Sequence, residues 1–263
     1  LLSRKRESGE ETIIGGMGRV LNLLRESELP ILFAPGVIHL PTVPNHRKVN
    51  RIDMGTADKV CSVALGVYDQ ARRLDVPHDE TSFLTVELGG AFSAVMAVES
   101  GAIVDGMGGT SGPPGYMASG AVDGEVAYLL GDFAKGTLSS GGVAYVAGDP
   151  DASPEQLITR ARTDQRASVA WDAFMEGLVK AVASLLTVVP SARELLVSGR
   201  LCRVPEIYHR VKAALAPFGP VRRVEGFARV AKEAAQGAAL IAEGLAEGRH
   251  KGLVEAMRLR EAT

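Results

Sequence analysis

The sequence predicts an α/β protein in which helices flank a mixed sheet, and three observations support this prediction. Three short apolar runs, 83–88, 93–98 and 102–105, are separated by glycine turns, a pattern typical of an antiparallel meander. Two later apolar runs, 194–197 and 221–224, alternate with helical patterns, as the strands of αβ units do. The chain has 263 residues, of which 46% are hydrophobic and 23% charged, so it can bury one large core or two smaller ones.

The residues before the meander predict a helix, a short strand and a second helix. Apolar residues recur at helical spacing over 13–26, and the apolar run 31–34 after Pro30 predicts a strand. A loop with two further prolines follows. Over 60–74, apolar residues form one face of a helix, for which Thr56 is well placed as the N-cap.

A long loop and a long helix are predicted in the middle of the chain. Residues 107–124 are rich in Gly, Ser and Pro, and they are too many for a simple connection in a compact domain. A helix over 124–130 and a strand over 141–147 follow. The tetrapeptide 153–156 offers a serine N-cap, a proline at the first helical position and a glutamine three residues after the cap. It therefore predicts the start of one long helix over 153–187.

The last third of the chain predicts alternating strands and helices. The strand 194–197 leads into the turn Ser198-Gly199-Arg200, and a helix begins at Pro205 and reaches 215. After the strand 221–224, an alanine-rich helix is predicted over 229–247. Small residues would let this helix pack very close to a neighbour, namely Ala234, Gly237, Ala238 and Ala242.

Charge, hydropathy and cysteine content exclude several classes of protein. The formal net charge is −2, which gives no basic footprint for nucleic acid, and no uncharged apolar run is long enough to predict a membrane span. Cys61 and Cys202 lie far apart, and two isolated thiols suit a reducing cytoplasm better than a disulfide scaffold. We therefore expect a cytoplasmic protein with no nucleic-acid and no membrane partner. The charged start at Leu1 indicates a fragment of a longer protein.

The Gly89-Gly90 turn is the most informative local feature. Two consecutive glycines between strands let backbone N–H groups approach an anion without a Cβ in the way, and Ser93 adds a hydroxyl donor. The same pair is also typical of an ordinary hairpin turn. Gly89, Gly90 and Ser93 are therefore candidate phosphate ligands, with the plain hairpin as the alternative.

Two further turns have the pattern of nucleotide sites. Ser198-Gly199-Arg200 places backbone amides after a buried strand and before a helix, where nucleotides commonly bind. In the segment 51–59, Asp53 and a Gly-Thr turn precede a helix N-terminus, which attracts phosphate, and Asp53 can hold Mg²⁺ through water. The alternative is that Thr56 only caps the helix, Asp53 is a solvated turn residue, and the charges at 58–59 lie on the surface.

Taken together, these motifs resemble a known superfamily. The segment 87–93, followed by 99–105, is similar to the strand-turn-strand phosphate loop of acetate and butyrate kinases, and 51–59 resembles the helix start that precedes this loop in acetate kinase. Ser198-Gly199-Arg200 resembles the adenosine-side turn of the superfamily, which also contains sugar kinases and actin. The segment 234–239 resembles its small-residue C-terminal helix. The order and spacing of all four agree.

More closely, the chain is similar to a mainly archaeal family described as predicted butyrate kinases (DUF1464), whose members carry segments much like 36–44 and 108–115. The resemblance implies a ribonuclease-H-like fold, with actin-type ATPase lobes whose mixed five-stranded sheets are flanked by helices. It implies that 1–60 is the remainder of an N-terminal lobe and its connection, and that 61–263 forms a C-terminal ATPase-like lobe. Members of the family also begin with an Asp-x-Gly-Thr phosphate loop, which would precede Leu1.

The sequence departs from the acyl kinases at three positions. Met54 and Glu87 stand where acetate kinase has histidines, and Ala118 stands where it has an arginine. Phosphoryl transfer depends on positioning and on neutralising charge, so these losses argue against a small carboxylate as the acceptor. Either Asp53 or Glu87 suits a metal ligand or a base for a hydroxyl acceptor, and Arg51 before the turn restores positive charge.

The resemblance implies an ATP- and Mg²⁺-dependent phosphotransferase whose partners are a nucleotide and a small-molecule acceptor, either a carboxylate or a hydroxyl compound. Asp53, Glu87 and Arg51 are the expected catalytic residues, and Asp53 is also the expected metal ligand. The expected nucleotide-binding residues are Thr56, Gly89, Gly90, Ser93, Ser198, Gly199 and Arg200.

Two alternatives remain at this point. One is a nucleotide-binding regulator or scaffold of the same fold without kinase turnover, and the other is a plain α/β domain with fortuitous glycine turns. Dimers are common among the relatives, so a homodimer is an open prediction.

Overall fold

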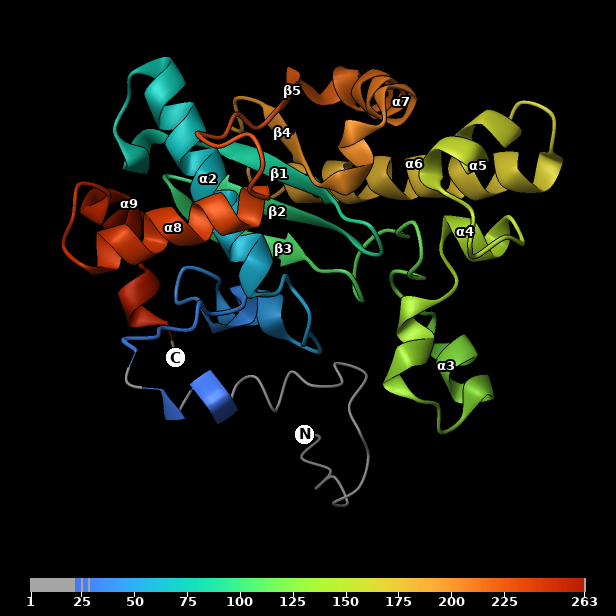
Figure 1. Ribbon diagram of the computed structural model, residues 1–263, viewed down its shortest axis with the longest axis horizontal. Coiled ribbons are helices and arrows are strands. Elements are labelled where there is room, and N and C mark those ends of the chain that lie inside the picture. The colour runs from blue at the N-terminus through green and yellow to red at the C-terminus, as the bar shows by residue number, and fades with distance from the viewer. Residues whose placement is uncertain (1–21, 25, 28, 263) are drawn as a thin grey trace.

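The computed structural model describes residues 22–24, 26–27 and 29–262, and within them it contains a five-stranded sheet with helices on both faces (Figure 1). The strand order is β3-β2-β1-β4-β5. The pairs β1–β2 and β2–β3 are antiparallel, whereas β1–β4 and β4–β5 are parallel. The predicted α/β class with a mixed sheet is therefore confirmed.

The meander and the later αβ units supply these elements in chain order. The strands are β1 (Phe83–Leu88), β2 (Ser93–Glu99), β3 (Ala102–Met107), β4 (Leu195–Ser198) and β5 (Val221–Arg223). The helices are α2 (Ala57–Leu74), α3 (Gly124–Leu130), α4 (Val143–Val146), α5 (Pro154–Arg160), α6 (Gln165–Leu186), α7 (Pro205–Leu215), α8 (Glu233–Leu245) and α9 (Lys251–Ala256).

Each face of the sheet carries its own apolar core, because successive residues of a strand point to opposite faces. On one face, α6 buries Trp171 and Phe174 against β1 residues such as Leu84 and Val86. On the other face, α2, α8 and α9 cover Phe83 and its neighbours. The segment that carries α3 lies away from the sheet, and α3 contributes no buried residue (Figure 1).

The closest helix pair is α2 against α8, as the small residues of the last predicted long helix indicated. A Cβ built on Gly237 of α8 would lie only 1.7 Å from the carbonyl oxygen of Cys61 on α2. Backbone therefore touches backbone at this crossing, and only glycine fits there.

Four strand ends meet at one edge of the sheet. The register pairs Leu88 with Ser93 and Val95 with Met107, so β1 and β3 end at the edge where β2 begins. The parallel pairing of Glu87 with Ser198 brings the end of β4 to the same edge. Two of the three turns that the sequence singled out for phosphate or nucleotide, Gly89-Gly90 and Ser198-Gly199-Arg200, follow these strand ends, whereas the turn at 53–56 precedes α2.

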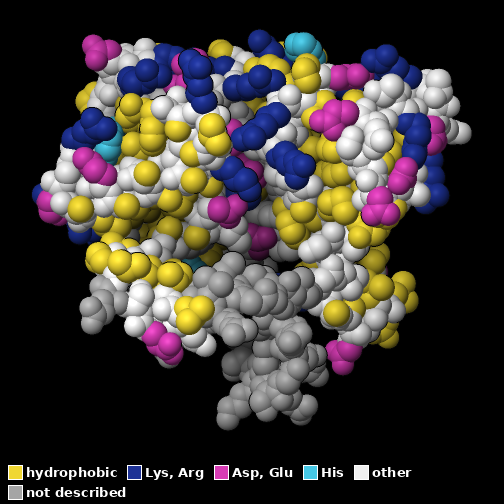
Figure 2. Space-filling model, viewed as in Figure 1, with side chains coloured by type: hydrophobic (Ala, Val, Ile, Leu, Met, Phe, Trp, Pro, Cys, Tyr) yellow, Lys and Arg dark blue, Asp and Glu magenta, His cyan; other side chains and the backbone are white. Residues whose placement is uncertain are grey.

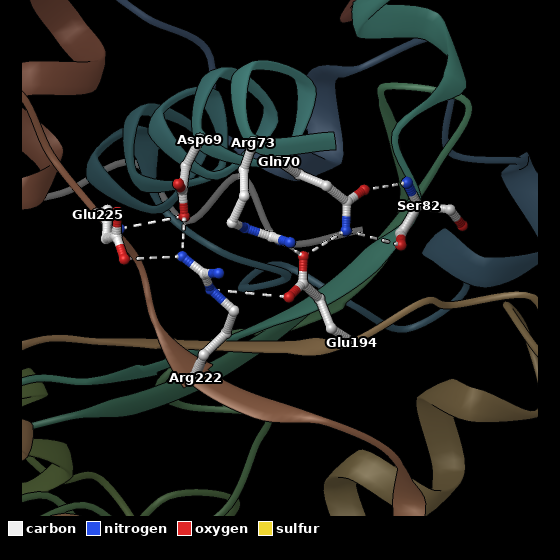
Figure 3. A network of polar contacts seen from close by, with 7 residues as sticks. All are labelled: Asp69, Gln70, Arg73, Ser82, Glu194, Arg222 and Glu225. Carbon is white, nitrogen blue, oxygen red and sulfur yellow. Dashed lines mark hydrogen bonds and ion pairs between the residues drawn. The ribbon is translucent and has the colours of Figure 1, made fainter. Parts of the chain in front are cut away.

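The opposite edge, where β1 and β4 begin, is filled by a network of polar side chains (Figure 3). Glu194 is only 6% exposed and sits at its centre. It accepts a hydrogen bond of 2.7 Å from Gln70 Nε2, forms an ion pair with Arg73, and lies 3.7 Å from Arg222 Nε. The side chain of Gln70 also accepts a hydrogen bond of 2.7 Å from the backbone N–H of Ser82. The network thus ties the last turns of α2 to the starts of both central strands.

Two predicted strands are wrong. Residues 31–34 form no strand, because Leu32 and Phe33 are exposed and no neighbouring strand accompanies them among the described residues. Residues 141–147 form the short helix α4 instead of a strand. Val143 and Ala147 are buried one helical turn apart, and a short apolar run cannot by its periodicity distinguish a strand from a buried helix.

Two predicted helices have different bounds. The predicted helix 153–187 is two helices, because Asp164 caps α6 by accepting hydrogen bonds from the N–H groups of Arg166 and Ala167. Its start is confirmed, since Ser153 and Gln156 form the predicted capping box. The helix predicted over 229–247 begins only at Glu233.

Other expectations stand as follows. The helix predicted over 13–26 falls mostly outside the described residues, and the division into 1–60 and 61–263 remains a prediction. Cys61 and Cys202 are both buried free thiols, as expected. Within the described part of the chain, every helix is too short or too polar to cross a membrane.

Replacing Gly237 with alanine should destabilise the fold. The new methyl group would overlap the Cys61 carbonyl, so we expect the free energy of unfolding to fall by about 2–3 kcal/mol, measured by chemical denaturation. Gly124→Ala is the matched control, because nothing lies within 4 Å of its added Cβ. Equal stability of the two variants would contradict the close crossing of α2 and α8.

Removing the carboxylate of Glu194 should also destabilise the protein. Glu194→Ala leaves Arg73 and Arg222 beside an apolar gap, and we expect a loss of about 3 kcal/mol in urea denaturation. Glu206→Ala removes an acid from the surface ion pairs with Arg162 and Arg210 and should cost about 1 kcal/mol or less. A cost for Glu194→Ala no larger than that of the control would show that the network is dispensable.

Candidate functional site

Two of the predicted glycine turns lie directly against each other. Gly199 has φ +98°, and a Cβ on it would lie 2.3 Å from the carbonyl oxygen of Leu88. A Cβ on Gly90 would lie 3.5 Å from Cδ of Arg200. The turn after β1 and the turn after β4 therefore form one continuous backbone surface, with the Arg200 side chain beside it.

The glycine-rich loop that follows β3 supports the Gly89-Gly90 turn from the other side. The carbonyl oxygen of Ala91 accepts hydrogen bonds of 3.1 Å from the N–H groups of both Met117 and Ala118. Gly115 passes so close that a Cβ on it would lie 2.0 Å from the same oxygen. The turn is thus fixed between two loops, which holds its backbone amides in one orientation.

Two serine hydroxyls at this edge are buried without a partner. Ser93 is fully buried and Ser198 is 5% exposed, and neither Oγ finds a hydrogen-bond partner among the described residues. An unpaired buried hydroxyl costs about 1–3 kcal/mol, so such groups need an explanation. Alternation along the strands places Ser93 on the α6 face with Val95 and Ser198 on the α2 face with Leu196.

Glu87, at the end of β1, forms a buried ion pair with Lys59 of α2. Lys59 Nζ lies 2.8 Å from Glu87 Oε2, and the two side chains are 11% and 13% exposed. Burial raises the pKa of Glu87 above its usual value, and Lys59 opposes that change only in part. Burial acts to lower the pKa of Lys59, but the carboxylates of Glu87 and Asp58 outweigh it and raise this pKa.

Thr56 occupies the predicted N-cap position of α2, but its side chain does not cap the helix. Its hydroxyl donates a hydrogen bond of 2.5 Å to Asp58 Oδ1 instead. The Asp58 carboxylate also contacts Lys59 Nζ at 2.8 Å. The hydrogen bonds to Lys59 and Thr56 lower the pKa of Asp58 although burial opposes them.

Asp53 anchors the glycine-rich loop after β3. Its Oδ1 accepts a hydrogen bond of 3.1 Å from the Gly55 N–H, and its Oδ2 accepts two from Thr110, at 2.8 Å from N and 3.0 Å from Oγ1. A Cβ on Gly108 would lie 1.8 Å from Asp53 Oδ1. Arg51 lies nearby with an exposed side chain. The predicted catalytic and metal roles of Asp53 and Arg51 remain predictions.

Met54 and Ala118, which the resemblance to acyl kinases matched to a histidine and an arginine, are both buried. Met54 is 1% exposed and belongs to the core under α2, and Ala118 is fully buried in the glycine-rich loop. Neither side chain faces the glycine turns as an exposed group, so positive charge at this edge comes from other residues.

The edge as a whole brings together seven of the predicted residues. They are Glu87, Gly89, Gly90, Ser93, Ser198, Gly199 and Arg200. Thr56 is connected to this edge by its hydrogen bond to Asp58, whose carboxylate contacts Lys59. Asp53 and Arg51 lie on the segment that precedes α2. Sequence reasoning included Lys59 in the candidate segment 51–59 but gave it no role, and its alternative placed this charge on the surface. The available signal was its position in the first turn of a helix, where a cation is electrostatically disfavoured.

Basic and acidic side chains gather around this region of the surface. Figure 2 shows Lys and Arg side chains near the middle of the face, beside the start of α8, with acidic side chains at the margin of a hollow below them. Within the described residues, no group of three or more His, Cys, Asp or Glu side chains is placed to hold a metal ion. The site is thus a polar, mainly backbone-lined edge.

One family model matches the whole chain. Residues 1–263 match the family described as "Protein of unknown function (DUF1464)". No curated protein sequence matches the chain.

Solved structures of acyl kinases share the fold. Acetate kinase from Porphyromonas gingivalis has 16% identity and a TM-score of 0.58, with 75% of this chain and 60% of that chain covered. A propionate kinase from Francisella tularensis has 20% identity and a TM-score of 0.55, with 73% and 51% covered. Acetate kinase from Entamoeba histolytica has 13% identity and a TM-score of 0.53, with 69% and 50% covered. The chain therefore spans only half to three fifths of their length.

The contact between the two glycine turns gives a testable contrast. Gly199→Ala combines a positive φ with a clash against Leu88, so we expect a loss of about 2–4 kcal/mol in the free energy of unfolding. Gly90→Ala meets only ordinary contacts and should leave stability within about 0.5 kcal/mol. Both are measured by urea denaturation. Comparable stability of the two variants would show that the turns are not in contact.

Proposed function

The chain belongs to the DUF1464 family, and from the geometry of its sheet edge we propose that it is an ATP-dependent phosphotransferase. The observation that supports the proposal most is the contact between the two glycine turns, where Gly199 touches Leu88 and Arg200 flanks Gly90. Adjacent backbone turns at the carboxyl ends of parallel strands are the usual setting for a nucleotide in open α/β sheets. The fold shared with acetate and propionate kinases agrees with this assignment.

The residues present fit a nucleotide. Glycines leave the backbone of both turns uncovered, and the unpaired hydroxyls of Ser93 and Ser198 supply donors that no described residue uses. The Arg200 guanidinium beside Gly90 adds a positive charge. We propose that Gly89, Gly90 and Ser93 hold phosphate groups and that the turn after β4 borders the nucleoside. When bound, ATP supplies the phosphoryl group that is transferred.

Fewer residues fit Mg²⁺ than fit the nucleotide. Mg²⁺ usually takes one or two carboxylates together with phosphate oxygens and water. Both oxygens of Asp53 already accept hydrogen bonds from the chain, so Asp53 fits as a ligand through water, as the sequence suggested. We propose that this ion enters with the nucleotide rather than occupying a site made by side chains alone.

The acceptor is proposed as a carboxylate or a hydroxyl compound. With Met54 and Ala118 buried, the charged side chains at the edge include Glu87, Asp58, Lys59 and Arg200, and Glu233 lies near enough to help raise the pKa of Glu87. A carboxylate acceptor would meet the negative charge of Glu87, whereas a hydroxyl acceptor would meet a potential base. The hydroxyl class is therefore tested beside the short carboxylic acids.

One observation favours a second function. The histidine and arginine of acyl kinases are replaced by buried apolar residues, Met54 and Ala118, and one well-placed Arg can contribute about 10³-fold or more in rate. A nucleotide-binding regulator or scaffold of the same fold would need the glycine turns but not these charges. A cytoplasmic location and a homodimer accompany either function as proposals.

Calorimetry with Mg-ATP tests the nucleotide site. We expect binding at millimolar nucleotide or below, and Gly90→Val should weaken it about tenfold or more, because the valine fills the space between the turn and Arg200. Gly124→Val is the control, since open space surrounds Gly124 on α3. Absence of heat with the wild-type protein, or equal binding by Gly90→Val, would contradict the proposal.

Turnover separates the enzyme from the regulator. ADP release would be followed with acetate, butyrate and a panel of sugars as acceptors. An acceptor-dependent rate supports the phosphotransferase and identifies the acceptor class. Binding of Mg-ATP without any acceptor-dependent release would support the regulator instead.

A further inference from the structure

Two carboxylates enclose the ammonium group of Lys59 at the first turn of α2. Its Nζ lies 2.8 Å from Glu87 Oε2 and 2.8 Å from Asp58 Oδ2. The Glu87 side chain is 13% exposed, whereas that of Asp58 is 55% exposed. The inner contact is therefore fixed in the protein, and the outer contact faces the surface, where another anion can take its place.

The same outer carboxylate occupies a second donor. Thr56 Oγ1 donates a hydrogen bond of 2.5 Å to Asp58 Oδ1, and Thr56 makes no capping bond of its own. One exposed side chain thus holds both the hydroxyl and the ammonium at the start of α2. A phosphate group presents the same arrangement of acceptor oxygens to two neighbouring donors.

Stability does not explain the position of Lys59. A cation in the first turn of a helix is opposed by the partial positive charge of the helix N-terminus. Replacing a buried ion pair by apolar residues is often neutral or stabilising. A buried lysine at this position is explained if its charge serves a ligand.

An independent observation indicates that a polar ligand belongs here. Ser198 is 5% exposed, and its Oγ finds no partner among the described residues. Its Cα is the register partner of Glu87, so both side chains lie on the face of the sheet that α2 covers. Glu87 in turn lies beside the first glycine turn, because a Cβ on Gly89 would be 3.5 Å from Glu87 Oε2.

We propose that Lys59 is a phosphate-binding residue of this site and that Asp58 is an internal competitor, which a bound polyphosphate displaces from Lys59 and Thr56. This inference deepens the proposed function and rests on it, since the ligand class is the polyphosphate of a nucleotide. Glu87 is the positioning residue that keeps Lys59 in place from the inside. Asp58 turns to solvent on displacement, and its exposed side chain has room to do so.

The proposal predicts that removing the acid Asp58 strengthens the binding of a polyphosphate. Removing Asp58 removes a competitor and also removes negative charge, so a matched charge control is needed. Glu176 on α6 forms an exposed ion pair with Lys180, on the face of the sheet opposite α2, and Glu176→Gln makes the same change in charge. Of these two acid-removing variants, only Asp58→Asn should change binding.

The test is a double-mutant cycle with Asp58→Asn and Lys59→Met, measured by calorimetry with Mg-ATP and, separately, with inorganic pyrophosphate. Asp58→Asn should bind both ligands about fivefold more tightly, as expected for the loss of a surface ion pair that competes with the ligand. Lys59→Met should bind about tenfold more weakly, and Asp58→Asn should give no gain in that background. Lys59→Arg keeps the positive charge, so Asp58→Asn should still strengthen ligand binding in that background.

Several results would overturn the inference. They are unchanged or weaker binding by Asp58→Asn, an equal gain in the Lys59→Met background, and an equal gain from Glu176→Gln. Absence of binding of both ligands to wild type and Asp58→Asn also overturns it. If Mg-ATP gives no heat but pyrophosphate shows the cycle, the assignment of Lys59 stands and the nucleotide proposal fails. If Lys59→Met does not fold, the inference is decided by whether Asp58→Asn binds the ligands more tightly than Glu176→Gln does.

Discussion

The parallel pairing of β1 with β4 in the middle of the sheet determines where the polar chemistry of this protein collects. Because Glu87 and Ser198 are register partners, the chain leaves both strands at the same level, and the turns that follow meet backbone to backbone. Gly199 is required there, since any Cβ would strike Leu88. The antiparallel neighbours add the start of β2 and the end of β3 to the same edge. Helix α2 runs back along the sheet, so its first turn, with Lys59, arrives at this edge too.

The two edges of the sheet hold different arrangements of buried polar groups. At the edge where β1 and β4 begin, Glu194 contacts two guanidinium groups and an amide, and α2 is tied to both strands (Figure 3). At the other edge, Ser93 and Ser198 are buried without partners, and an exposed aspartate shares a lysine with a buried glutamate. Burial of polar groups is costly unless they are paired. The network at the first edge ties α2 to both central strands, although buried atoms of Asp69, Arg73 and Arg222 there lack hydrogen-bond partners too, and the ligand at the second edge is our proposal.

The sequence predicted the strands and the glycine turns because those signals are local. The meander, the capping box at Ser153 and the small-residue contact at Gly237 all depend on neighbouring residues or on steric size. It failed at 141–147, where a short apolar run fits a strand and a buried helix equally. It could not place Lys59, because the partner of this residue lies far away in the sequence and only the parallel register brings them together. The catalytic roles given to Asp53 and Arg51 remain predictions, because the structure shows only hydrogen bonds of Asp53 within the chain.

The positively charged residues at the edge where β1 and β4 end come from two different elements of the chain. The sequence resemblance matched Met54 and Ala118 to charged residues of acyl kinases, and both are buried here, Met54 in the core under α2 and Ala118 in the glycine-rich loop. Lys59 and Arg200 reach the same turns from a helix start and from the turn after β4. Phosphoryl transfer requires charge near the phosphate more than it requires a particular residue type. Under the proposed function, Lys59 and Arg200 would supply this charge beside the glycine turns.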